Sequence, residues 1–420
     1  MEKSKAVVFV PHQDDEVNLV GNCIDRLLES YEVYIVFSSM DTNRKMAQMR
    51  KKEAIKSCKI LGVPQNKVLF LDYPDTPNRL KKHYFTDGDT RIVCDIINIL
   101  RRYSPSLIIG TDFDYHSDHK MLSLALEEAI GVVVSEKHQL YKPLVLKGFC
   151  YETAFCGVKD YFQSKNGRCV SQGELLGNPS YIWNKRVSLF GNEKERFIWK
   201  KKAFRALLAH KSQYAILRAE SVLNKDNVYW IRRTDNLLLN DRVKISASSG
   251  NTHLINDFMF LQTDDISPIR FCEHDFSKAV WKPDANDLER YLYIQLEQIH
   301  LIEKIVFRGN PSSENYMPVD GEIQIGATVI RLSEIMPYAR ETVVQLNGIK
   351  TDSIIIRFKS YVEISEVEVF ESNEPNCLVN EIGKLFQPVV QPKEMFWIGR
   401  LYYLFICLYY KIKRKIFPIK

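Results

Sequence analysis

The chain has 420 residues and a formal net charge of +6, and 45% of its residues are hydrophobic and 26% charged. These fractions are typical of a folded globular protein and exclude a disordered, collagen-like or polytopic membrane chain. Five Lys and Arg and no acidic residue occupy the last ten positions, so the other 410 residues carry a charge of only +1. A nucleic-acid-binding protein needs a broad basic face, whereas this sequence offers a basic tail, so we expect no nucleic-acid partner.

The N-terminal part of the chain alternates β-branched runs with helical patterns. Strands are predicted at 6–10, 33–38, 68–73 and 107–112, with helices at 17–30, 43–61 and 91–103 between them. A strand that alternates with a helix predicts a Rossmann-like α/β fold, with a mostly parallel sheet and flanking helices. A further helix is expected at 193–217.

A second pattern begins near residue 240, where short β-rich runs follow one another with turn residues and no helices between them. Strands at this spacing predict an all-β sandwich. We therefore divide the chain into an α/β domain at 1–235, a β-sandwich at 240–372, a linker at 373–393 and a helical tail at 394–420.

Cysteines and the N-terminus bear on where the protein works. The nine cysteines are scattered without a Cys-x-x-Cys pair, which favours reduced core thiols over disulfides or a cysteine zinc site. The segment MEKSKAVVFVPHQDDE contains an apolar run of five residues, shorter than a secretory signal needs. We expect a cytoplasmic protein.

A polar cluster follows the first predicted strand, with His12, Asp14, Asp15 and Glu16 in the run PHQDDE. Ligands of an open parallel sheet bind at the carboxyl ends of its strands. Because these acids repel one another, a divalent cation would relieve the crowding. The alternative is a solvated loop whose carboxylates lie at a helix N-terminus.

A second cluster follows the fourth strand, where His116 and His119 are spaced to share one face of a starting helix. Two histidines and a carboxylate from the two clusters could bind one ion and leave a position for water, as catalytic zinc sites do. An incidental polar loop is the alternative. The location of both clusters at carboxyl ends of parallel strands favours the metal site.

The two runs PHQDDE and HSDH together resemble the paired signatures of the PIG-L/LmbE-like de-N-acetylase family. The segments Arg50-x-x-Glu53-Ala54, Tyr73-Pro74-Asp75 and His210-Lys211-Ser212-Gln213 resemble further parts of that family, over about residues 1–215. The family most often has Pro where this chain has Gln13 and Ser117. The resemblance implies a zinc-dependent hydrolase that removes the N-acetyl group from an amino sugar, glycan or glycolipid.

By this resemblance, one zinc ion is bound by His12, Asp15 and His119. Asp14 would be the general base. Zinc lowers the pKa of its bound water to about 7, and a carboxylate beside a metal ligand can accept the proton that this water loses. His116, oriented by Asp118, would stabilise the oxyanion.

Arg50 and Asp75 would contact the substrate, again by resemblance. Two alternatives remain open. The first is a catalytically degenerate protein that binds glycan or docks to a membrane, although the intact Asp14 favours an enzyme. The second is a deacylase that acts on a non-sugar amide.

Residues 240–372 resemble a discoidin-like (coagulation-factor type C) sandwich at Ala247-Ser248-Ser249, Trp281 and Ile355-Ile356-Arg357-Phe358. Modules of this fold often bind glycans through their loops, but the fold does not determine the ligand. A glycan partner and a purely structural role therefore both stay open.

The C-terminal tail combines seven aromatic residues within 396–410 with the basic decapeptide that follows. A spanning helix needs about 20 apolar residues, and Arg400 interrupts this stretch. Aromatic side chains and flanking Lys and Arg favour the lipid–water interface. We expect peripheral association with the cytoplasmic face of a membrane; an amphipathic helix packed on the protein is the alternative.

Overall fold

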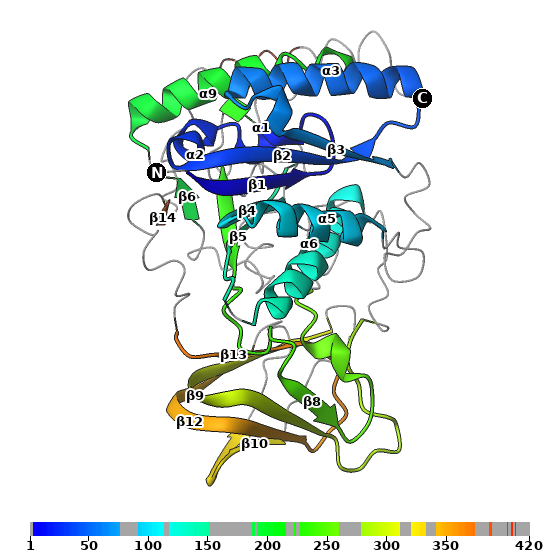
Figure 1. Ribbon diagram of the computed structural model, residues 1–420, viewed down its shortest axis with the longest axis vertical. Coiled ribbons are helices and arrows are strands. Elements are labelled where there is room, and N and C mark those ends of the chain that lie inside the picture. The colour runs from blue at the N-terminus through cyan, green and yellow to red at the C-terminus, as the bar shows by residue number, and fades with distance from the viewer. Residues whose placement is uncertain are drawn as a thin grey trace.

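The computed structural model describes residues 3–75, 91–112, 117–138, 140–150, 187–189, 191–215, 222–223, 227–259, 279–310, 321–332, 342–373 and 386–388, and positions 401, 405 and 408. The chain forms an α/β domain followed by an antiparallel β domain (Figure 1), which confirms both predicted fold classes. Within these residues, no helix is long and apolar enough to cross a membrane.

The α/β domain is built on an eight-stranded sheet with the order β14-β6-β7-β5-β4-β1-β2-β3. Its parallel strands are β1 (Ser4–Val10), β2 (Tyr31–Met40), β3 (Val68–Pro74), β4 (Leu107–Thr111) and β5 (Leu144–Gly148). The strand order reverses between β1 and β4, because the chain first builds the sheet outward from β1 to β3 and then returns to the other side of β1. Such a reversal brings two strand ends together at a crevice where ligands bind.

Three short strands extend the sheet in the antiparallel sense. β7 (Val228–Arg232) pairs with β5, β6 (Val187–Leu189) with β7, and β14 (Phe386–Pro388) with β6. The sequence predicted none of them, since strands this short carry no clear periodicity. Because β14 lies in the predicted linker, the chain returns to the α/β sheet after the β domain.

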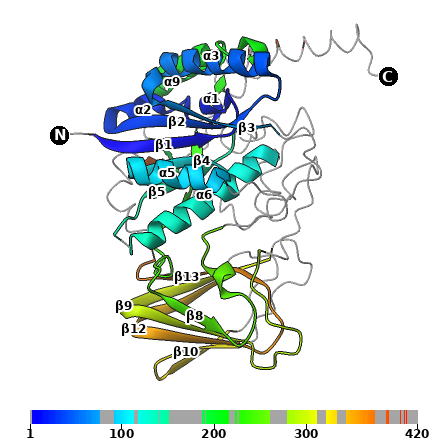
Figure 2. The same ribbon diagram turned by 45° about the vertical axis from the view of Figure 1, so that its right-hand side comes forward.

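Helices cover both faces of the sheet (Figures 1 and 2). One side carries α1 (Asp15–Val20), α2 (Ile24–Ser30), α3 (Arg44–Leu61) and α9 (Glu193–Leu207), and the other carries α5 (Arg91–Tyr103) and α6 (Ser117–Glu136). The helix predicted at 17–30 is divided in two at Gly21, whose backbone lies so close to α9 that an added Cβ would be 3.1 Å from that of Ala203. α9 ends at Leu207, short of the predicted 217.

The β domain is a six-stranded antiparallel sheet with the order β11-β10-β12-β9-β13, in which β8 also pairs with β9. Its strands are β8 (Lys244–Ala247), β9 (Tyr291–Gly309), β10 (Gly321–Ile325), β11 (Thr328–Leu332), β12 (Thr342–Phe358) and β13 (Ile364–Phe370). β13 is buried along its whole length because it also touches the α/β domain: Glu368 of β13 forms an ion pair with Arg232 of β7. The two domains therefore share a buried joint.

Candidate metal centre

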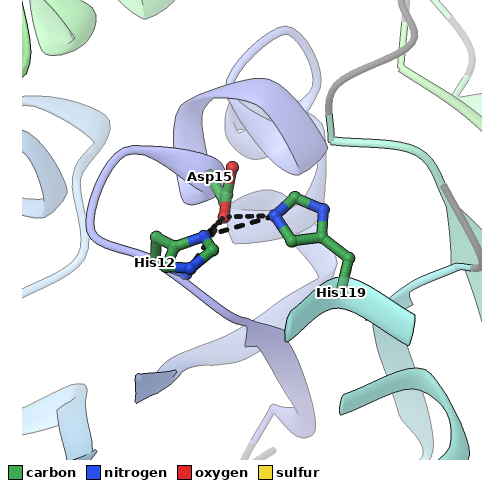
Figure 3. A group of neighbouring side chains, drawn as sticks. All are labelled: His12, Asp15 and His119. Carbon is green, nitrogen blue, oxygen red and sulfur yellow. Dashed lines mark hydrogen bonds and ion pairs between the residues drawn. The ribbon is translucent and has the colours of Figure 1, made fainter. Parts of the chain in front are cut away.

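Three side chains meet where β1 and β4 end (Figure 3). His12 and Asp15 come from the loop after β1 and the start of α1, and His119 comes from the first turn of α6. His12 Nδ1 and His119 Nε2 each lie 3.2 Å from Asp15 Oδ2 and 3.3 Å from each other. All three side chains are buried. The structure thus brings together the three residues that the sequence predicted as metal ligands.

The geometry of this triangle fits a divalent ion. Zinc bound tetrahedrally to nitrogen and oxygen at about 2.0–2.1 Å holds its ligand atoms about 3.3 Å apart. The second oxygen of Asp15, Oδ1, is buried and has no hydrogen-bond partner within the described residues. A buried carboxylate oxygen without a partner is costly in a site made only of protein. Three protein ligands would leave a fourth position for water or substrate.

The acids and imidazoles of the centre shift one another's pKa values. Burial alone would lower the pKa of His12, but the carboxylates of Asp118 and Asp15 outweigh it and raise the pKa to about 9. Burial alone would raise the pKa of Asp15, but the imidazoles of His119 and His12 hold it well below its usual value. Asp15 therefore stays ionised, as a metal ligand must.

Asp118 lies against a metal ligand. Its Oδ2 is 3.0 Å from His12 Nε2, the ring nitrogen that points away from the triangle. A carboxylate at this position fixes the tautomer and orientation of a ligating histidine. The sequence paired Asp118 with His116 instead, which lies outside the described residues. The contact with His12 is a role that the motif spacing did not indicate.

The two residues predicted to contact substrate border the same site. Asp75 Oδ1 is 3.6 Å from His12 Nε2, and Asp75 Oδ2 is 3.7 Å from Arg50 Nη1. The same Arg50 nitrogen lies 3.7 Å from Asp41 Oδ2. Arg50 is on the buried side of α3, so it belongs to the site and is not the surface charge that a basic helix usually presents.

Asp14, the predicted general base, is buried and occupies a strained backbone position. Its φ of 144° and ψ of −17° place a non-glycine residue where side chains rarely lie. Such strain costs about 1–3 kcal/mol and persists only where the surroundings hold it. The preceding side chain provides one restraint, because Gln13 Nε2 donates a hydrogen bond to the carbonyl of Ser39 at 2.6 Å.

On the other side of Asp14, a buried network restrains α1. Glu16 Oε1 accepts hydrogen bonds from Ser57 Oγ at 2.5 Å and His210 Nε2 at 2.8 Å. Burial alone would lower the pKa of His210, but Glu16 raises it above its usual value. The sequence indicated Glu16 only as a member of the polar cluster after the first strand, and it indicated no role for His210. The only sequence signal for this contact was the family-like segment His210-Lys211-Ser212-Gln213. Its spacing from Glu16 along the chain did not indicate that the two side chains would meet.

Comparison with known families identifies this part of the chain. Residues 7–130 match the family model described as PIG-L: GlcNAc-PI de-N-acetylase. The chain contains a PIG-L domain. The matched segment holds all three residues of the metal triangle, together with Asp14, Arg50, Asp75 and Asp118.

Solved structures are similar to both halves of the molecule. An N,N'-diacetylchitobiose deacetylase from Pyrococcus horikoshii is 16% identical over 55% of this chain and 84% of its own, with a TM-score of 0.37. The 4-carboxy-2-hydroxymuconate hydratase GalB from Pseudomonas putida is 15% identical over 55% and 95%, with a TM-score of 0.32. The family 32 CBM of NanJ from Clostridium perfringens, in complex with galactose, is 15% identical over 30% and 92%, with a TM-score of 0.22. At these scores the similarities identify neither reaction nor ligand.

Proposed function

We propose that the chain is a zinc-dependent N-deacetylase that hydrolyses the acetamide of an N-acetylated amino sugar. The observation that carries this proposal is the buried triangle of His12, Asp15 and His119 inside the PIG-L domain, with the strained Asp14 directly beside it. Zinc bound there would polarise the amide carbonyl and lower the pKa of water at the open position.

The chain's own residues divide the remaining work. Asp14 takes the proton that the attacking water loses and gives it to the amine nitrogen as the C–N bond breaks, which leaves acetate and a free amino sugar. Asp118 keeps His12 in the tautomer that a ligand needs. His116 is proposed to stabilise the oxyanion, as the family resemblance implies. Arg50 and Asp75 would hold sugar hydroxyls at the edge of the site.

A panel of N-acetyl compounds tests this proposal. Purified protein with zinc is incubated separately with free N-acetylglucosamine, diacetylchitobiose, a nucleotide sugar, a polyprenyl-linked glycan and a non-sugar acetamide. Mass spectrometry then measures the masses of the products. We expect loss of one acetyl group from at least one sugar, but not with His12→Ala or His119→Ala protein, which should also lose its zinc by elemental analysis. Cleavage of the non-sugar acetamide alone would identify another amide as substrate. No cleavage at all by zinc-loaded protein would favour a binding protein.

We also propose that the tail holds the protein on the cytoplasmic face of a membrane, near a lipid-linked sugar. In the described part of the tail, the helical residues Leu401, Phe405 and Leu408 are each more than half exposed. Their spacing places them on one side of a helix, next to the basic decapeptide. The glycan partner of the β domain stays a prediction.

Vesicle flotation tests the tail. The full-length protein should float with anionic vesicles at low salt, whereas a chain that ends at Pro392 should bind much more weakly and keep its activity on soluble substrates. Equal flotation of both chains would mean that the tail is packed on the protein.

A further inference from the structure

Helices α3 and α9 form one outer face of the α/β domain. They lie side by side over the sheet (Figures 1 and 2), and their buried residues, such as Ala54 and Leu61 of α3 and Ala203 and Leu207 of α9, join the same core. Their opposite sides therefore point away from the sheet together. The two helices contain thirteen Lys and Arg and three Glu, a formal charge of +10 that exceeds the +6 of the whole chain.

Much of this charge is exposed and unneutralised. Lys51 is paired with Asp72 at 2.5 Å, and Lys202 is paired with Asp25. Eight other cations of the two helices are exposed and form no ion pair with any described residue. Together with the exposed Lys211, which follows α9, they constitute the basic face; the eight are Arg44, Lys45, Lys52, Lys56, Lys59, Lys194, Lys201 and Arg205. The sequence-based expectation of a basic tail in place of a basic face is therefore wrong, because two helices far apart in the sequence combine their charges.

Apolar side chains stand among these cations. Ile198 is 51% exposed between Lys194 and Lys201, and Met49, Leu208 and Tyr214 are 43%, 37% and 75% exposed. Single exposed apolar residues are common on proteins. Here, however, Met49 and Ile198 lie on the same two helices as the lysines, and Leu208 and Tyr214 follow the end of α9, on either side of Lys211 in the sequence. Cations interspersed with exposed apolar side chains are typical of surfaces that enter the lipid headgroup region. The phosphates of a nucleic acid would attract the cations but would make no favourable contact with the aliphatic side chains.

We propose that the basic face docks onto an anionic lipid bilayer. The inference rests on the membrane location in the proposed function and adds a contact that does not depend on the tail. Lys and Arg near an anionic leaflet each strengthen binding by about fivefold, and the apolar side chains add a contribution that salt does not screen. α3 also links the face to the metal centre, since Arg50 lies in the site on its buried side while Lys52 is exposed on the other. A sugar headgroup at the membrane surface would thus be presented about one helix diameter from the site.

Flotation of the full-length chain with phosphatidylcholine vesicles, with and without phosphatidylserine, tests this surface. The triple variant Lys52→Glu/Lys56→Glu/Lys201→Glu should lower the partition coefficient for the anionic vesicles by at least about a hundredfold. The matched control is Lys244→Glu/Arg331→Glu/Lys350→Glu, which changes net charge equally on exposed positions of the β domain and should change binding far less. A second variant, Ile198→Ser/Leu208→Ser, should weaken the binding that remains at high salt.

Several results would overturn the proposal. Equal losses in the two triple variants would mean that only net charge matters, and undiminished binding of the first triple would leave the tail as the membrane contact. Binding to double-stranded DNA that the first triple abolishes, with no vesicle binding by the wild type, would assign the face to nucleic acid. Deacetylation of a soluble substrate should be equal in all these variants, so its absence from every protein, wild type included, would count against the proposed activity and not against docking.

Discussion

Among the residues that the structure describes, buried carboxylates collect at the metal centre and at the joint between the domains. At the centre, the buried Asp15 and Asp118 and the half-buried Asp75 lie around His12. At the joint, Glu366 and Glu368 of β13 lie near Arg232 of β7. Both places put several acids out of water, which is unfavourable unless the charge is paired or removed.

The two places solve this problem in opposite ways. At the joint, Glu368 is paired with Arg232 and accepts two hydrogen bonds from Arg308, at 3.1 and 2.9 Å. Burial, and then the charge of Asp257, raises the pKa of Glu366 well above its usual value, which favours its neutral form. At the centre the pKa of Asp15 is instead held low, although one of its oxygens has no partner among the described residues. An ionised carboxylate beside two imidazoles suits the binding of a cation. A neutral carboxyl group instead suits a packed interface between two domains.

The largest effect should come from Asp14→Asn, which tests whether Asp14 is the general base. The substitution keeps the shape of the side chain but removes the base, so turnover of the N-acetylated sugar should fall about 10²–10⁴-fold while zinc content stays the same. Asp72→Asn is the matched control, because Asp72 also has a positive φ, of 63°, but is exposed and outside the site. Turnover equal to the wild type in Asp14→Asn would mean that another group moves the proton.

The next prediction concerns the joint, where we expect a stability effect and no effect on zinc binding. Glu368→Ala removes the carboxylate between Arg232 and Arg308, and breaking a buried ion pair by removing one partner costs about 3–5 kcal/mol. Urea unfolding monitored by circular dichroism measures this loss. Glu297→Ala breaks the exposed pair with Arg242 and should leave the unfolding curve close to that of the wild type. Loss of zinc from Glu368→Ala protein would show that the two places are coupled.

Sequence periodicity predicted four of the five parallel strands and missed β5. It also predicted the paired motifs, because β1 and β4 are short apolar runs that end in polar clusters. The joint could not be predicted in this way. Arg232, Glu368 and Phe258 come from segments far apart in the sequence, and an alternating run such as ISEVEVF reads as a strand with one solvated face. Glu366 and Glu368 occupy positions that a two-layer pattern assigns to solvent, and only the packing of the second domain buries them. The partners of Asp118 and His210 were missed for the same reason.

A pH series on Glu366→Gln sharpens the contrast between the two kinds of carboxyl. Because the folded state raises the pKa of Glu366 above the unfolded value of about 4.3, folding binds a proton, and the wild type should lose stability as pH rises above that value. The loss amounts to about 1.4 kcal/mol for each pH unit between the two pKa values. Glutamine is neutral at every pH, so the variant should gain stability over the wild type as pH increases. Urea midpoints at pH 5 and pH 9 give the comparison, and parallel shifts of the two proteins would show that Glu366 is ionised in the fold.

The smallest effect should come from Gln13→Met, which asks whether the strain at Asp14 is held from outside the metal triangle. Methionine has nearly the same length but cannot donate to the carbonyl of Ser39, so about 1 kcal/mol of stability should be lost with the buried hydrogen bond. If that bond helps to hold Asp14 in its strained conformation, kcat should fall severalfold while zinc content does not change, because the substitution leaves the three candidate metal ligands in place. Ser57→Ala is the companion variant on the opposite side, since it removes one of the two bonds to Glu16 that restrain α1. Additive losses of kcat in the double variant would indicate two independent restraints on the same backbone strain. A loss of stability with unchanged kcat in both single variants would show that Asp14 keeps its conformation without them, and that the two hydrogen bonds serve packing alone, as the ion pairs of the joint do.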